Sequence, residues 1–184
     1  MTKTEARKLA KACRAAVDLH TVGHAMAGVL FTLPAWQHAD TVLAFASMPD
    51  EPDTADILRQ ALVEGKRLLL PRVLSRTEMD WVEITALSQL QPGAYGILEA
   101  PASLPAFDTA HLGDGALALI PCLAASPDGV RLGRGGYYDR FLAHYKGRRL
   151  LVCPTAALLG DLPCEGWDVR FSPHEILTEK GILL

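Results

Sequence analysis

The fold of this chain is decided by the stretch ALALIPCLAASPDGVRLGRGGYYDRFL, which covers residues 116–142. Its first part, ALALIPCL (116–123), is a continuous apolar run of the kind that forms a strand buried on both faces of a sheet. A segment rich in glycine and arginine follows at 131–136, and the residues from Tyr137 onward are predicted to be helical. The order strand, glycine-rich loop, helix is typical of open α/β sheets, which bind ligands at the carboxyl ends of their strands.

The rest of the chain repeats this alternation of strands and helices. Strands are expected at 41–46, 67–73, 79–84, 148–154 and 175–178, and helices at 3–19, 22–31 and 53–65. The alternation predicts one domain over residues 1–184, a three-layer α/β/α sandwich with a mainly parallel, Rossmann-like sheet. In the helix at 3–19, Leu9, Cys13 and Ala16 are expected on the apolar face. Arg7, Lys11 and Arg14 are expected on the opposite, basic face.

Composition narrows the class of protein further. The chain has 184 residues, is 49% hydrophobic and carries a net charge of −3, which predicts a packed core and argues against a general affinity for nucleic acid or anionic membranes. Cys13, Cys122, Cys153 and Cys164 show no metal-ligand spacing, so a reducing compartment is favoured over a disulfide framework. The N-terminus has no signal-peptide pattern, and no apolar run is long enough to span a bilayer. These observations predict a cytoplasmic protein.

The glycine-rich loop suits the binding of phosphate. Its three glycines allow backbone N–H groups to approach an oxyanion closely, and Arg131 and Arg134 can add charge-assisted hydrogen bonds. Asp139, in the following helix, suits a magnesium ligand or a helix cap. A tight turn with solvated arginines and a capping aspartate would explain the same residues, so the loop alone leaves both interpretations open.

The same segment resembles the signature of the 5-formyltetrahydrofolate cyclo-ligase family, which ends in Arg-Leu-Gly-x-Gly-x-Gly-Tyr-Tyr-Asp. Four further segments match the family pattern in order and extend the resemblance over nearly the whole chain. They are KTEAR (3–7), FASMPDEPDT (45–54), EGKRLLLPRV (64–73), and LPCEGWD (162–168) followed by ILTE (176–179).

The resemblance implies an enzyme that uses ATP and Mg²⁺ to convert 5-formyltetrahydrofolate to 5,10-methenyltetrahydrofolate, with release of ADP and phosphate. Phosphorylation of the formyl oxygen would activate that carbon, and the neighbouring nitrogen would then close the ring and displace phosphate. The implied activity is that of a ligase forming a C–N ring bond, acting on a small molecule with neither nucleic acid nor membrane as partner. Monomer and homodimer are both left open.

The resemblance also assigns roles to individual residues. Asp139 and Asp168 are expected to bind Mg²⁺, and Arg134 and Asp139 to take part in catalysis. The residues expected to contact ATP are Lys3, Arg7, Arg131, Leu132, Gly133, Arg134, Gly135, Gly136, Tyr137 and Tyr138. The residues expected to contact the folate are Ala46, Glu51, Arg134, Gly135, Gly136 and Tyr137, with the Glu51 carboxylate accepting hydrogen bonds from two adjacent N–H groups of the pterin. Trp81 matches no site residue and is assigned to packing.

The chain departs from the family pattern at several positions. Its loop, GRGGYYD, is one residue shorter, and Trp167 stands where the family has histidine. Ala125 and Ser126 replace a Phe-Asp pair, and Ala157 replaces a glutamine. Two alternatives follow from these differences: a paralogous Mg-ATP-dependent enzyme with a different acceptor, and a non-catalytic module that binds a phosphate ligand. The first predicts ATP binding without a response to 5-formyltetrahydrofolate, and the second predicts binding without turnover.

Overall fold

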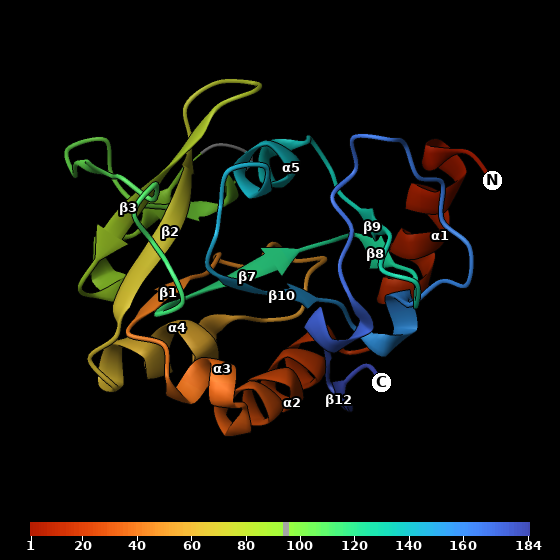
Figure 1. Cartoon of the computed structure of the whole chain (residues 1–184), viewed down its shortest axis with the longest axis horizontal. Coiled ribbons are helices and arrows are strands. Elements are labelled where there is room, and N and C mark those ends of the chain that lie inside the picture. Colours follow the sequence, from red (N-terminus) through yellow and green to blue (C-terminus); the bar gives the residue numbers. More distant parts are fainter. Residues whose placement is uncertain (94–95) are drawn as a thin grey trace.

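A large sheet runs through the middle of the molecule (Figure 1). The structure, a computed structural model, describes residues 1–93 and 96–184. Within these residues the sheet has eight strands in the order β12-β11-β10-β7-β1-β2-β3-β6. In that order the strands are Gly181–Ile182, Ile176–Thr178, Arg148–Val152, Ala116–Pro121, Thr41–Leu43, Arg67–Val73, Met79–Ile84 and Ala106–Phe107.

The centre of the sheet is parallel and its edges are antiparallel. The parallel strands are β11, β10, β7, β1 and β2, while β12 pairs antiparallel with β11 and β3 pairs antiparallel with β2 and β6. In β7, the five residues from Ala116 to Ile120 are all buried, as expected for a strand covered on both faces. The predicted sheet of mainly parallel strands is therefore confirmed.

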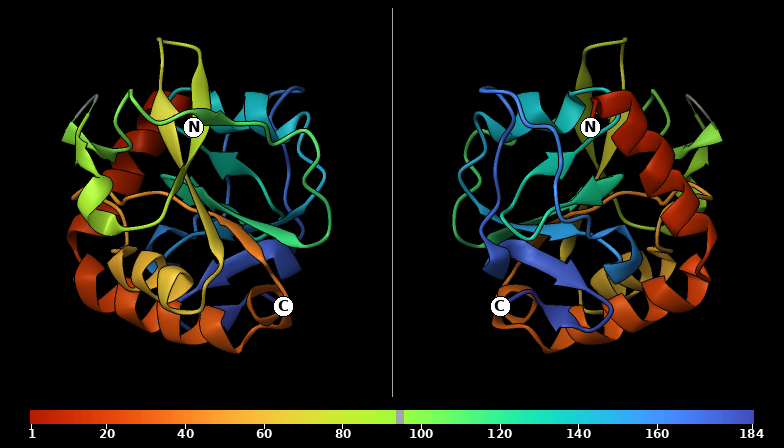
Figure 2. Two further views of the ribbon diagram at one scale, coloured as in Figure 1. Left: turned by 90° about the vertical axis from the view of Figure 1, so that its left-hand side faces the viewer. Right: turned by 90° about the vertical axis from the view of Figure 1, so that its right-hand side faces the viewer.

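Helices cover both faces of the sheet, which confirms the three-layer arrangement (Figure 2). On one side, α2 (Leu19–Thr32), α3 (Pro34–Gln37) and α4 (Ala55–Val63) share one apolar cluster with the sheet. On the other side, α1 (Lys3–Ala15) and α5 (Tyr137–Leu142) share a second cluster with it. In the part of the chain that the structure describes, no helix has both the length and the apolar composition needed to cross a membrane.

Short elements connect the main ones. Two small antiparallel sheets pair β4 (Gln91–Pro92) with β5 (Leu98–Glu99), and β8 (Ala124–Ala125) with β9 (Arg131–Leu132). Short 3₁₀ helices span Leu87–Gln89 (η1), Thr155–Ala157 (η3) and Pro173–Glu175 (η4). The β8–β9 hairpin is important for the site, because it links the end of β7 to the glycine-rich loop.

Two predictions about the first helix are wrong. α1 ends at Ala15 and α2 begins at Leu19, because Asp18 accepts a hydrogen bond from the backbone N–H of His20 and so caps a new helix. The buried face of α1 consists of Ala6, Ala10 and Arg14, whereas Leu9 is 44% exposed. Small alanine side chains let α1 approach η3 and β9 closely, and Arg14 is buried because backbone carbonyls accept its N–H groups.

Most of the other helix and strand boundaries agree with those predicted from the sequence, although some elements are shorter than predicted. β2 and β3 have the predicted bounds, and Thr54 is the N-cap residue of α4. The strand expected at 41–46 ends at Leu43 because the chain then turns into a loop, although Ala44 still donates a hydrogen bond to Leu69 O at 2.9 Å. The helix that follows the glycine-rich loop ends at Leu142.

Candidate active site

The glycine-rich loop, residues 133–136, separates two cavities at the carboxyl ends of the central strands. Gly136 has a φ of 72°, in the left-handed region, and it directly precedes α5 as the N-cap residue. This conformation suits glycine and turns the chain sharply into the helix. Gly133, Arg134 and Gly136 line both cavities, so the loop forms the boundary between them.

The larger cavity, of about 710 Å³, is bounded mainly by the ends of strands. Ala46, Met48 and Glu51 come from the loop after β1, Val73 from the end of β2, and Cys122 from just after β7. Other apolar lining residues are Phe45, Pro71, Met79, Ile97, Leu98, Pro121 and Leu123. This volume lies in the range typical of small-molecule sites, and so does the combination of apolar walls with a few polar groups.

The smaller cavity, of about 410 Å³, is lined mostly by charged side chains. Its lining includes five cationic side chains, those of Lys3, Arg7, Arg131, Arg134 and Arg140. Two carboxylates also line it, those of Asp139 and Asp168, together with Leu132, Ala143 and Trp167. Five cationic groups around two carboxylates make a site suited to a polyanion.

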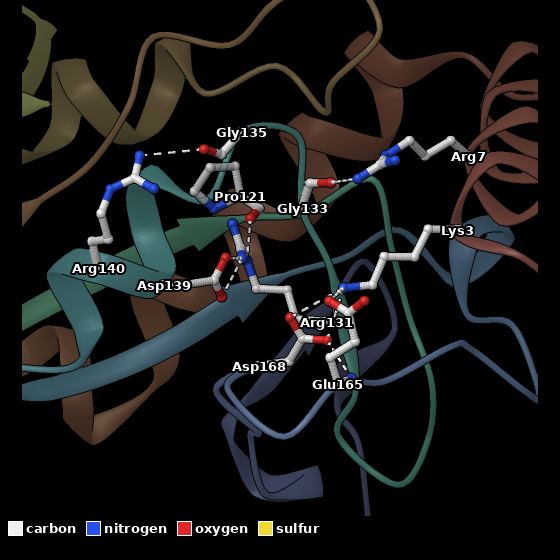
Figure 3. A network of polar contacts seen from close by, with 10 residues as sticks. All are labelled: Lys3, Arg7, Pro121, Arg131, Gly133, Gly135, Asp139, Arg140, Glu165 and Asp168. Atoms are coloured by element: carbon white, nitrogen blue, oxygen red, sulfur yellow. Dashed lines mark hydrogen bonds and ion pairs between the residues drawn. The ribbon is translucent and has the colours of Figure 1, made fainter. Parts of the chain in front are cut away.

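One end of the smaller cavity is closed by Lys3, which holds a C-terminal loop against α1 (Figure 3). Lys3 Nζ lies 2.6 Å from a Glu165 carboxylate oxygen and 3.1 Å from Asp168 Oδ2. The hydrogen bond to Glu165, followed by that to Asp168, raises the pKa of Lys3 above its ordinary value. These contacts bring together two segments that are 162 positions or more apart in the sequence.

At the other end, Arg131 fixes Asp139. The Arg131 guanidinium donates to both Asp139 carboxylate oxygens, at 3.1 and 3.2 Å, and to Pro121 O at 2.9 Å (Figure 3). It also lies 5.6 Å from the centre of the Tyr138 ring. Asp139 is thereby held beside the carboxyl end of β7, with its side chain partly exposed to the cavity.

Two further arginines contact the loop itself. Arg7 donates to Gly133 O at 3.5 Å, and Arg140 donates to Gly135 O at 3.3 Å (Figure 3). The loop carbonyls therefore hold two guanidinium groups at the cavity. Arg140 was not among the site residues predicted from the sequence, although its position directly after Asp139, in the first turns of the helix, is a signal that could have identified it.

In the larger cavity, Glu51 is a buried carboxylate, with 8% of its surface exposed. Its Oε2 accepts a hydrogen bond from Met48 N at 3.0 Å, and its Oε1 lies 3.7 Å from Arg134 Nε. Burial raises the pKa of Glu51 above its ordinary value. Arg134 also pairs with Asp50 at 2.7 Å, so the loop after β1 is tied to the glycine-rich loop.

Arg14 connects α1 to two segments that border the larger cavity, a role that the sequence analysis missed. Its guanidinium is buried and donates to Leu123 O at 2.7 Å, to Asp50 O at 2.6 Å and to Cys122 O. One side chain thus joins α1, the end of β7 and the loop that carries Glu51. The expectation of a solvated Arg14 was wrong because amphipathic spacing does not indicate which carbonyls will meet a helix.

The aromatic residues around the loop have different surroundings. Tyr138 lines the larger cavity, and burial raises its pKa. Tyr137 donates from its hydroxyl to Ser75 O at 2.8 Å, and the Arg140 guanidinium lies 5.3 Å from the centre of its ring. Trp81 is 3% exposed and packs against Phe141 with their ring centres 4.9 Å apart, which agrees with its assignment to packing.

The two carboxylates suit a metal ion that is shared with a ligand. Asp139 and Asp168, the two residues expected to bind Mg²⁺, both line the smaller cavity, and each is paired with a cationic side chain. Among residues 1–93 and 96–184, no group of three or more histidine, cysteine or carboxylate side chains could hold a metal by itself. Mg²⁺ is usually bound by one or two carboxylates together with substrate phosphates, and this donor set fits that pattern.

The predicted site residues form two overlapping sets, because Arg131, Gly133, Arg134 and Gly136 line both cavities. All six residues predicted to contact the folate line the larger one. Lys3, Arg7 and the residues from Arg131 to Arg134, with Gly136, line the smaller one. Gly135, Tyr137 and Tyr138, which were also predicted to contact ATP, line the larger cavity and not the smaller one.

Three of the substitutions relative to the family pattern lie away from the cavity walls. Ala125 and Ala157 are fully buried in the cluster that α1 covers, and Ser126 is buried in the turn between β8 and β9. None of the three is among the described residues that line either cavity. Trp167 is the exception, because it lines the smaller cavity.

Comparisons with a family model and with individual proteins point to the same family. The chain matches the 5-formyltetrahydrofolate cyclo-ligase family over residues 2–179. It is 30% identical to a 5-formyltetrahydrofolate cyclo-ligase of Mycolicibacterium smegmatis over 152 residues, which cover 78% of this chain and 76% of that protein. It is also 30% identical to the protein of that name from Escherichia coli K12 over 154 residues, covering 80% and 84% of the two chains.

Solved structures extend the likeness to the fold. The structure of the 5,10-methenyltetrahydrofolate synthetase of Aquifex aeolicus superposes with a TM-score of 0.83 at 26% identity, covering 100% of this chain and 92% of that one. A 5,10-methenyltetrahydrofolate synthetase from Mycoplasma pneumoniae superposes with a TM-score of 0.73 at 20% identity, covering 97% and 99%, which supports the fold.

Proposed function

This chain belongs to the 5-formyltetrahydrofolate cyclo-ligase family, and on that basis we propose that it converts 5-formyltetrahydrofolate to 5,10-methenyltetrahydrofolate with ATP as co-substrate. The observation that carries the proposal is the pair of cavities that share the glycine-rich loop. One is largely apolar with two buried carboxylates, Glu51 and Glu99, and the other is strongly cationic. A reaction between a folate and a nucleoside triphosphate needs two such sites in contact.

The larger cavity would take the pterin end of the folate. Its apolar walls suit a flat aromatic ring, and the Glu51 carboxylate can accept hydrogen bonds from adjacent N–H groups of that ring. Met48 N and Arg134 hold Glu51 in place before the substrate arrives. Such preorganisation lowers the entropy that binding would otherwise cost.

The smaller cavity would take the triphosphate. Lys3, Arg7, Arg131 and Arg140 supply positive charge, and the backbone of the glycine-rich loop can approach phosphate oxygens closely. Asp139 and Asp168 would hold Mg²⁺, which neutralises phosphate charge when it is bound. Arg131 and Lys3, which now pair with these carboxylates, would keep them oriented toward the cavity.

Catalysis would depend mainly on alignment and charge neutralisation. The formyl oxygen is an amide-type oxygen and a weak nucleophile, so it must be held in line with the γ-phosphorus. The glycine-rich loop lies between the two cavities, and Arg134 lines both, so this residue is placed to neutralise charge on the group in transfer. Once the formyl oxygen carries phosphate, the neighbouring nitrogen can attack the activated carbon and phosphate leaves.

The alternatives raised by the sequence receive less support. A changed acceptor was inferred from Ala125, Ser126, Ala157 and Trp167. The first three lie outside both cavity walls, and Trp167 lines the smaller, cationic cavity and not the one proposed for the folate. We further propose that residues 1–184 act as one domain in the cytoplasm, a setting that the four free cysteines support. We propose no nucleic-acid or membrane partner.

The direct test follows the absorbance of the methenyl product formed from 5-formyltetrahydrofolate, with and without ATP and Mg²⁺. The proposal predicts product only when ATP is present, and a rate lowered at least about 100-fold by Asp139→Asn. Asp108→Asn is the matched control, because the Asp108 side chain is 69% exposed and lines neither cavity. A wild-type protein that binds both ligands without forming product would contradict the proposed activity. A full rate in Asp139→Asn would contradict the role of that residue alone.

A further inference from the structure

Trp167 is unusual among the tryptophans of this chain because it is exposed. It is 75% exposed, whereas Trp36 and Trp81 are 1% and 3% exposed. Among the large hydrophobic residues that are exposed in the described part of the chain, it is the only aromatic one. It also lines the smaller cavity, next to Asp168. Its position in the cavity wall offers a ligand in that cavity a flat aromatic surface on which to pack.

The loop that carries Trp167 is held in a defined position. Asp168 N donates to Glu165 O at 3.0 Å, and Glu165 N donates to Asp168 Oδ2 at 2.7 Å, which closes a tight turn around Trp167. Lys3 then binds both acidic side chains of this turn and fixes it against α1 (Figure 3). The backbone at Trp167 is therefore anchored on both sides although the indole itself is exposed.

The other aromatic rings near the loop are less suited to a ligand in the smaller cavity. Tyr137 and Tyr138 line the larger cavity, and the Tyr137 ring faces the Arg140 guanidinium at 5.3 Å. Trp167 is the one aromatic residue among the described residues that line the smaller cavity. A nucleotide presents a polyphosphate at one end and a flat aromatic base at the other, and this cavity offers cationic side chains together with one free indole face.

We propose that Trp167 forms the stacking surface for the base of the nucleoside triphosphate, an inference that rests on the proposed function. Stacking uses the face of a base and not its hydrogen-bonding edge. Trp167 should therefore favour purines, which offer a larger ring surface, over pyrimidines, and should discriminate little between adenine and guanine. The triphosphate is bound separately, by the cationic residues.

The test compares the affinities of ATP, CTP and inorganic tripolyphosphate for wild-type protein, Trp167→Ala and Trp167→Phe by calorimetry. Wild type should bind ATP more tightly than CTP. Trp167→Ala should raise the Kd of ATP about tenfold, raise that of CTP less, and leave that of tripolyphosphate unchanged, whereas Trp167→Phe, which keeps an aromatic face, should stay within about threefold of wild type. ATP should also change the tryptophan fluorescence of the wild type more than tripolyphosphate does, and this difference should vanish in Trp167→Phe. Val63→Ala is the control, because Val63 is 73% exposed on α4 and lines neither cavity.

Each other outcome has a distinct meaning. Equal Kd values for ATP in wild type and Trp167→Ala would overturn this inference and leave the proposed function intact. Equal weakening of ATP and tripolyphosphate in Trp167→Ala would also overturn it, since it would mean that Trp167 positions the turn of Asp168 and does not touch the base. A wild-type protein that does not bind ATP would contradict the proposed function and this inference with it.

Discussion

The two cavities share the glycine-rich loop but are built in different ways. The larger one is formed mainly at the ends of strands, where β1, β2 and β7 place buried apolar residues and Glu51 side by side. The smaller one is assembled from α1, α5 and a C-terminal loop, which lie far apart in the sequence and side by side in the fold (Figure 1). Ion pairs between partly exposed side chains join Lys3 to that loop.

This difference indicates which forces maintain each half of the site. The geometry of the larger cavity depends on the packed core and on buried hydrogen bonds, which salt affects little. In the smaller cavity, the position of the C-terminal loop depends on the ion pairs of Lys3 near solvent, which are individually weak and are screened by salt. Mutations and solution conditions should therefore affect the two cavities unequally.

The largest effect on stability is expected from Arg14→Met, which disrupts the support of the larger cavity. Methionine keeps an apolar stem but leaves the carbonyls of Asp50, Cys122 and Leu123 without the donor that they share. The loss should lower the free energy of unfolding by on the order of 3 kcal/mol, because unsatisfied buried acceptors each cost about 1 kcal/mol or more. Urea unfolding at neutral pH measures this change.

The control for Arg14→Met is Lys11→Met, since Lys11 is an exposed basic residue on the same helix. It should change the free energy of unfolding by less than about 0.5 kcal/mol. Similar losses in the two variants would mean that Arg14 contributes only as a residue of the helix and does not support the cavity.

A smaller effect on stability, one that depends on pH, is expected from the carboxyl group of Glu51. Burial raises the pKa of Glu51 in the folded protein, so the folded state holds this proton more tightly than the unfolded state. Its contribution to stability should therefore fall as the pH rises from the unfolded pKa, about 4.3, through the folded pKa, and then stay level. Over the same window kcat/KM for the folate should rise, because the ionised carboxylate is the better acceptor of N–H groups.

Glu51→Gln removes the titrating group, so the comparison with wild type isolates its contribution. Unfolding curves and initial rates should be collected for both proteins over the same series of pH values. The difference in stability between them should lose its pH dependence above the folded pKa. A difference that is constant over the whole series would show that Glu51 has the same pKa in both states.

The smallest effect on stability is expected from Lys3→Met, in the smaller cavity. The ion pairs of Lys3 with Glu165 and Asp168 are partly exposed, so their loss should cost less than about 1 kcal/mol of unfolding free energy at low salt. The cost should shrink further in about 1 M salt, where charges are screened over about 3 Å. A loss as large as that of Arg14→Met, and insensitive to salt, would remove the distinction between the two cavities.

Much of the fold could be predicted from the sequence because its signals are local. The apolar runs at 67–73 and 116–123 indicate buried strands, and the alternation with helices indicates a parallel sheet with two covered faces. The break between α1 and α2 was predicted a few residues too late, because Asp18 caps the second helix within the range assigned to the first. The short strands β4, β5 and β6 were missed because two residues carry no detectable periodicity.

The site was only partly predictable, because several of its contacts join segments that are distant in the sequence. Sequence motifs identified Glu51, the glycine-rich loop and Asp139, but the pairing of Lys3 with Asp168 depends on how distant segments fold together. Arg14 was misjudged because its burial is decided by carbonyls of the residues just after β7 and of the loop after β1. The division of the loop residues between two cavities likewise depends on the distant segments that surround the loop in the fold, which the sequence does not specify.

The central claim, that the two cavities bind different substrates, is tested most directly by measuring the Kd of 5-formyltetrahydrofolate and of ATP separately in two variants. Glu51→Gln should raise the Kd of the folate at least about tenfold and leave that of ATP nearly unchanged, because it loses one charge-assisted acceptor in the larger cavity. Arg7→Ala should do the reverse, because Arg7 lines only the smaller cavity. If either variant weakened both ligands equally, the division of the site into a folate cavity and a nucleotide cavity would be wrong.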